Sequence, residues 1–221
     1  MKSLSLIFVL ALIALPARVQ AASSVLTMSG IELYGFFSAS NSCALSGNFS
    51  FSTSVQKEPG TGGTTTPGGF VFANVSCPGT NALCAGGFTQ VNISSNPPTP
   101  TQLPKTVVAS GTAPLTLLIG SGDCGGPLEM RLSATAVGIP FTTSFTAHQT
   151  YPSTTNPQVV VMYDEHTTGN ATDAIGTLTV NYGGQPLTAS VAGLTFSNSK
   201  SHRVEIVGAP AGVGLLGAPL R

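Results

Sequence analysis

The stretch that decides the fold class is Ile175-Gly-Thr-Leu-Thr-Val-Asn-Tyr-Gly-Gly-Gln-Pro-Leu-Thr-Ala-Ser-Val-Ala-Gly-Leu-Thr-Phe196. Two runs, 175–182 and 187–196, flank the dipeptide Gly183-Gly184. Consecutive glycines tolerate positive φ at both central positions of a turn, as a type I′ β-hairpin requires. The sequence therefore predicts an antiparallel hairpin here.

Short strand-like runs separated by turn residues recur through the rest of the chain. Between residues 25 and 55 the apolar row Phe49, Phe51, Thr53 and Val55 alternates with Asn and Ser, and a similar row, Ile31, Leu33, Gly35 and Phe37, precedes it. No helical periodicity free of Gly or Pro is found after residue 21. About ten short strands predict an all-β fold, an antiparallel β-sandwich or barrel-like domain. Beyond residue 55 the expected strands are 70–76, 88–94, 106–109, 115–119, 128–137, 141–147, 159–163, 175–182, 187–196 and 204–207.

The first 21 residues have the order of a secretory signal peptide. A basic start at Lys2 is followed by the apolar run Leu4–Leu15, and small residues stand at Val19 and Ala21. The run is too short to span a bilayer. We expect cleavage before Ala22 and a secreted or extracellular chain; a buried N-terminal helix is the alternative.

The expected organisation is a signal peptide, 1–21, and a single β-rich domain, 22–207. An exposed Gly/Thr/Pro loop is expected at 57–69 and a Pro-rich break at 96–104. The apolar Gly/Ala/Pro tail, 208–221, is expected to be a frayed terminus. It resembles the C-terminal sorting tails of surface-anchored proteins, and a GPI-type signal is a further alternative.

Charged residues are scarce, at 7% of the chain. Without the leader's Lys2 and Arg18, six basic residues stand against eight acidic ones, a net charge of about −2. Such a chain has no electrostatic footprint for nucleic acid or an anionic membrane. We expect no nucleic-acid partner, no transmembrane span after cleavage, and an extracellular or surface partner that the sequence does not identify.

Four cysteines, Cys43, Cys77, Cys84 and Cys124, all lie after the leader. An even number in a secreted chain predicts two disulfides. Three pairings are possible, and the turn-rich segment between Cys77 and Cys84 favours joining those two, which leaves Cys43 with Cys124. No C-x-x-C pair or histidine cluster indicates zinc, and we expect neither a metal nor a cofactor.

The sharpest local motif is Gly122-Asp-Cys-Gly-Gly-Pro-Leu128. It resembles the nucleophile loop of trypsin-like peptidases, with cysteine in the serine position as in viral cysteine peptidases of that fold. The resemblance implies a β-rich fold in which Cys124 is the nucleophile. No histidine precedes His148, so the base would stand in a different chain order. We interpret the motif as a glycine-rich turn whose cysteine is in a disulfide, so that no catalytic residue is assigned; a Cys124–His148 peptidase is the alternative.

Two weaker binding signals remain. The carboxylates from Asp164 to Asp173 predict a solvated polar connection, with a Ca²⁺ loop as the alternative. A glycan-binding module is the other option, but the chain has no tryptophan and four tyrosines, so the usual aromatic platform is not evident. Sequons at Asn48, Asn74, Asn92 and Asn170 make the chain a candidate glycoprotein in a competent host.

Together these features predict a secreted or surface-displayed, non-enzymatic β-domain with a structural, adhesive or matrix role. The cysteine peptidase is the alternative from a different functional class, and the state of Cys124 distinguishes the two, because a nucleophile must be a free thiol.

Overall fold

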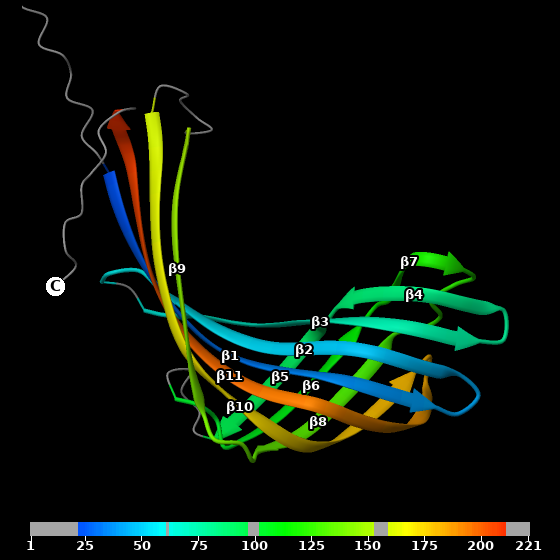
Figure 1. The fold of residues 1–221 in the computed structure, drawn as a ribbon. Coiled ribbons are helices and arrows are strands. Elements are labelled where there is room, and N and C mark those ends of the chain that lie inside the picture. The colour runs from blue at the N-terminus through cyan, green and yellow to red at the C-terminus, as the bar shows by residue number, and fades with distance from the viewer. Residues whose placement is uncertain (1–21, 61, 97–101, 153–158, 211–221) are drawn as a thin grey trace, which may run out of the picture.

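The computed structural model describes residues 22–60, 62–96, 102–152 and 159–210, and the described chain is all-β and antiparallel. Its strands are longest near the two ends of the described chain and shortest in the middle (Figure 1). They are β1 (Ala22–Ser40), β2 (Ala44–Lys57), β3 (Thr64–Cys77), β4 (Thr80–Gly87), β5 (Thr89–Asn96), β6 (Thr106–Ala113), β7 (Thr116–Ser121), β8 (Leu128–Ala136), β9 (Phe141–Pro152), β10 (Val159–Tyr182) and β11 (Gln185–Pro210).

All eleven strands belong to one sheet, in the order β5-β6-β8-β10-β11-β1-β2-β3-β4-β7. Strand β9 lies off this path and pairs with β10. One edge of β10 is shared: residues 160–171 pair with β9, and residues 174–182 pair with β8. The other edge of β10 pairs with β11 along most of its length.

The sheet curls into a half-barrel, and its inner face forms the hydrophobic core. Strand alternation places the odd-numbered residues of β1, β2 and β3 on that face, and Phe49, Phe51 and Val71 are fully buried. Phe88, between β4 and β5, stacks on Phe51 with ring centroids 4.4 Å apart. This contact brings the β5–β6 end of the sheet over the β2–β3 part, as in a sandwich.

Four strands continue past the curled body as a single layer, which we call the extension (Figure 1). It contains residues 22–30 of β1, 141–152, 159–170 of β10 and 199–210 of β11. The side chains of residues 141–150 are exposed except Ala147, which is half-buried. Phe145, on β9, is 62% exposed.

The all-β prediction is confirmed, and so is the hairpin that decided it. Gly183 and Gly184 have φ of 57° and 80°, and Tyr182 pairs with Gln185 across the two-residue turn. The apolar rows predicted in β1 and β2 also lie inward, since Leu33, Phe37 and Phe49 are buried.

The expectation that all strands are short is wrong. β10 has 24 residues and β11 has 26, so the segments predicted separately at 159–163 and 175–182 form one strand. The polar stretch between them stays extended because β9 and β11 supply hydrogen-bonding partners on both sides. The predicted solvated connection over 163–173 is therefore strand.

Two loop predictions are also corrected. The turn-rich segment expected between Cys77 and Cys84 is short: Pro78-Gly79 forms a tight turn, and Thr80 begins β4, which pairs with β3. The expected loop 57–69 is shorter, because β3 begins at Thr64 and its exposed first residues pair with β2. Strand β5 ends at Asn96 and β6 begins at Thr106.

Three predicted segments fall wholly or partly outside the described residues: the signal peptide 1–21, the prolines within 97–101, and the tail from 211 onward. In the part of the chain that the structure describes, we find no helix with the length and hydropathy needed to cross a membrane.

Candidate functional site

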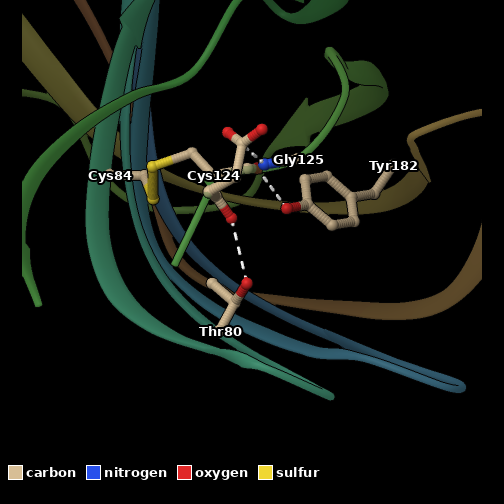
Figure 2. Close-up of a disulfide and its surroundings, with 6 residues drawn as sticks. Thr80, Cys84, Cys124, Gly125 and Tyr182 are labelled. Carbon is tan, nitrogen blue, oxygen red and sulfur yellow. Dashed lines mark hydrogen bonds between the residues drawn. A yellow bond between two sulfur atoms is a disulfide. The ribbon is translucent and has the colours of Figure 1, made fainter. Parts of the chain in front are cut away.

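Cys124 lies in the loop between β7 and β8 and forms a disulfide with Cys84 of β4 (Figure 2). The second disulfide joins Cys43 to Cys77. The pairing predicted from the sequence, Cys77–Cys84 with Cys43–Cys124, is wrong. The tight turn after Cys77 places Cys77 opposite Thr80. Cys84 lies four residues beyond Thr80 on β4, or about 13 Å from it, so it is too far from Cys77 to form a disulfide with it.

The Cys43–Cys77 bridge follows from the strand register. Ala44 of β2 pairs with Ser76 of β3, so the next opposed pair outward is Cys43 and Cys77, with Cα atoms 4.5 Å apart. Directly opposed residues of an antiparallel pair come this close where no backbone hydrogen bond joins them. The bridge thus closes the end of the β2–β3 ladder.

The loop around Cys124 contacts β4 on one side and β10 on the other, and we call it the joint. Thr80 donates its hydroxyl to the Asp123 carbonyl at 3.1 Å, and Tyr182 donates to the Cys124 carbonyl (Figure 2). Gly125 has φ of 72°, and its amide donates to the Asp123 carboxylate at 3.2 Å. Burial, with a smaller contribution from the Asp123 carboxylate, raises the pKa of the Tyr182 hydroxyl.

The two residues of the peptidase alternative are not brought together. His148 lies on β9 of the extension, opposite Asp164, and its Nδ1 contacts that carboxylate. Cys124 contacts Tyr182, which is 18 residues beyond Asp164, or about 60 Å of strand contour. All four cysteines are in disulfides, so Cys124 carries no thiol in this structure.

Histidines gather on one face of the extension without forming a metal site. His166 is opposite His202, and the His166 ring lies 3.1 Å from the Thr146 hydroxyl. Among the described residues, no three His, Cys, Asp or Glu side chains meet closely enough to hold a metal ion. Asp164 and Glu165 point to opposite faces because neighbouring residues of a strand alternate, which explains why the acidic stretch does not form the Ca²⁺ loop considered above.

The best candidate site is on the convex side of the body. We define the outer face as the even-numbered residues 32–40 of β1, 44–52 of β2 and 70–76 of β3, together with Thr188, Ser190, Ala192 and Thr195 of β11. These residues alternate with the core residues of the same strands, so the core fixes their orientation.

Four aromatic rings project from the outer face in two pairs. Tyr34 and Phe36 of β1 meet edge to face with centroids 5.4 Å apart, and Phe70 and Phe72 of β3 do so at 5.6 Å. The three phenylalanines keep between 39% and 50% of their surface exposed. Gly193, with φ of 57°, lies against the Phe36 ring, where an added Cβ would be 3.1 Å from Cδ2.

Strand β2 lies between the two aromatic pairs and supplies a polar floor. Ser50 pairs with Tyr34 on one side and Phe70 on the other, and Asn48 pairs with Phe36 and Phe72. The Asn48 Oδ1 atom is buried and has no hydrogen-bond partner. An unpartnered buried acceptor is uncommon in proteins and calls for an explanation.

The floor continues into a hollow of about 430 Å³ lined mainly by hydroxyl and amide side chains. Within it, the Ser38 and Ser190 hydroxyls are 2.9 Å apart. Along the outer face as defined, which is described throughout, Glu32 is the one charged residue, and it accepts a hydrogen bond from Ser50 at 2.7 Å. The outer face thus combines aromatic rings with uncharged polar groups.

A second hollow, of about 400 Å³, lies over β5, β6, β8 and β10. Glu129 and Arg131 line it, and the Asn181 amide donates to Glu129 at 3.2 Å. Gln90, at its rim, has φ of 52°, the one positive value among the non-glycine residues described. This hollow has no aromatic lining, so the outer face is the stronger candidate.

The comparisons with known proteins supply no further constraint. No family model, curated protein or solved structure matches the chain. The candidate site therefore rests on its own geometry.

The aromatic pairs were missed from the sequence because a search limited to tryptophan and tyrosine overlooks phenylalanine. A signal was present: the residues between the core positions of β1 include Tyr34 and Phe36, two positions apart, and those of β3 include Phe70 and Phe72. The sequons stay untested as modification sites; Asn74 and Asn92 are exposed, and Asn48 and Asn170 are half-buried.

Proposed function

We propose that the chain is a secreted or surface-displayed, non-enzymatic β-domain that works by adhesion through its outer face. The observation that carries the proposal is two pairs of aromatic rings on an almost uncharged sheet face, in which the three phenylalanines are 39–50% exposed and Tyr34 is half-buried. Exposed apolar patches bordered by polar residues often mark interaction sites, and each aromatic pair forms such a patch beside the polar residues of β2. Because β-strands hold these rings, binding needs little ordering of the protein.

Other features support the extracellular setting. The leader has the form of a signal peptide, and the two disulfides are suited to an oxidising compartment. The arrangement of Cys124 and His148 described above does not support the peptidase alternative. A catalytic role would need another constellation, and we propose none.

The test is adhesion of the secreted protein to the cell envelope and extracellular material of the producing cells. The double variant Phe36→Thr/Phe72→Thr keeps strand propensity and removes one ring from each pair. We expect at least a tenfold loss of bound protein at subsaturating concentration. Phe145→Thr removes a more exposed ring from the extension and should bind as the wild type does.

Equal binding by all three proteins would contradict adhesion through the outer face. Thermal unfolding of each variant must accompany the assay, so that lost binding is not confused with lost fold. A double variant that unfolds cooperatively near the wild-type temperature and still binds would end the proposal.

A further inference from the structure

We propose that the outer face binds a neutral polysaccharide, with sugar rings packed against the two aromatic pairs and sugar hydroxyls bonded to the floor and hollow between and beside them. This inference rests on the adhesive function proposed above and names the chemistry of its ligand.

The aromatic pairs are suited to sugar rings. One face of a hexose ring presents aliphatic C–H groups, which pack favourably on the electron-rich face of an aromatic ring. Ring surface is available in both pairs, because Phe36, Phe70 and Phe72 are 39–50% exposed. The pairs stand two strands apart, about 10 Å, so each can contact a different unit of an extended chain.

The floor between the pairs is polar but largely covered, since Ser50 is 2% exposed and Asn48 is half-buried, whereas Glu32 at its end is exposed. Asn48 Oδ1 is a buried acceptor without a protein partner, and a sugar hydroxyl satisfies it once the half-buried side chain turns toward the ligand. Glu32 accepts from Ser50 at the end of the same floor and retains further acceptor capacity. A donor-rich, uncharged ligand matches these acceptors.

The hollow beside the aromatic rows extends the polar contact. Its lining includes Ser38, Ser46, Asn74 and Ser190, side chains that donate and accept equally well. A volume of about 430 Å³ is in the range of pockets that hold small ligands, so it is large enough for a sugar unit or a branch.

The absence of positive charge on the outer face separates this ligand from others. An anionic polymer would need Lys or Arg, and the outer face as defined contains neither. A protein partner would be expected to meet a charged rim, whereas the outer face has Glu32 as its one charged residue and is otherwise Ser, Thr, Asn, Ala and the aromatic rings. A neutral polyhydroxylated chain fits the surface best.

The experiment measures binding of soluble neutral polysaccharides, namely β-1,3-glucan, mannan, galactan and xyloglucan, by calorimetry and by retardation in affinity gels. Alginate serves as the charged comparison. The protein is produced in a host without N-glycosylation, because Asn48 and Asn74 are sequons on the outer face. We expect at least one neutral polymer to bind, with affinity almost unchanged between low and high salt.

The variants then locate the site. Phe36→Thr/Phe72→Thr should weaken binding at least tenfold, Asn48→Ala should weaken it severalfold, and Phe145→Thr should leave it unchanged. Lack of binding to all four neutral polymers, or binding that survives the double variant, would overturn the proposal.

One further arm separates this proposal from adhesion itself. Periodate treatment opens sugar rings that carry vicinal diols, and it is combined with a β-1,3-glucanase because 1,3-linked glucan has no such diols; protease digestion removes proteins from the envelope. If the wild type still adheres after the periodate and glucanase treatment but not after protease digestion, adhesion stands and the partner is a protein, so the polysaccharide proposal is wrong. Loss after the periodate and glucanase treatment alone supports it.

Discussion

Removing the Cys84–Cys124 disulfide is the most quantitative test of the fold. The bridge joins residues 40 apart, and the chain-entropy model gives such a closure about 4 kcal/mol at room temperature. Both cysteines are buried, so Cys84→Ala/Cys124→Ala also removes packed sulfur atoms from the core. We expect the free energy of unfolding to fall by about 4 kcal/mol, a large share of the roughly 5–15 kcal/mol of a typical domain.

The assay is urea unfolding followed by circular dichroism, with Cys43→Ala/Cys77→Ala as the matched control. That bridge joins residues 34 apart, which gives about 4 kcal/mol as well. A Cys77–Cys84 bridge would close only a short loop, worth about 2 kcal/mol.

Thiol labelling tells the pairings apart directly. In the single variant Cys84→Ala, iodoacetamide added after unfolding without a reductant should label Cys124 and leave Cys43 and Cys77 bridged. Labelling of Cys77 in that variant, or a loss below about 1 kcal/mol in the Cys84/Cys124 double variant, would refute the reasoning.

Three further predictions concern turns and the joint. Gly184→Val should cost about 1–3 kcal/mol by urea unfolding, because a β-branched residue resists a φ of 80°; a loss under about 1 kcal/mol would contradict the turn. Gly125→Ala should cost a similar 1–3 kcal/mol, since its Cβ would overlap the Tyr182 hydroxyl as well as stand at positive φ; an unchanged urea midpoint would show that the joint yields easily. The raised pKa of Tyr182 means that the unfolded chain loses this proton first, so the free energy of unfolding does not depend on this group below about pH 10 and falls as pH rises above it. Tyr182→Phe should lack that part of the fall. Parallel curves of unfolding free energy against pH for the wild type and the variant would refute this prediction.

Alternation made the core of β1 and β2 predictable, because a period of two is visible in sequence whenever one face is buried. Leu33, Phe37, Phe49 and Phe51 could be placed inward for this reason. The Gly183-Gly184 turn was predictable because its chemistry is local.

Long strands and disulfide pairing were not predictable, because both depend on neighbours distant in the sequence. Gly30 and Gly169 suggest strand ends, yet each lies within a strand and is paired across it. The pairing of Cys77 depended on whether the chain turned at Pro78-Gly79 or later, and either turn is compatible with the sequence. The position of this turn decides which cysteines come together.

The composition of the candidate site also depended on neighbours distant in the sequence. Tyr34 and Phe36 were visible in sequence as residues facing away from the core, but their proximity to Phe70 and Phe72 depends on β2 lying between β1 and β3. The alternating pattern shows which face of its own strand a residue occupies. Only the strand register shows which residues of different strands form one surface.

The most direct test of adhesion through the outer face is radical footprinting of the aromatic residues, read by mass spectrometry, with and without the bound envelope material. Tyr34, Phe36, Phe70 and Phe72 should be protected on binding, whereas Phe145, which is more exposed, should be oxidised to the same extent in both states. Protection of Phe145 with no change at the four outer rings would contradict the account.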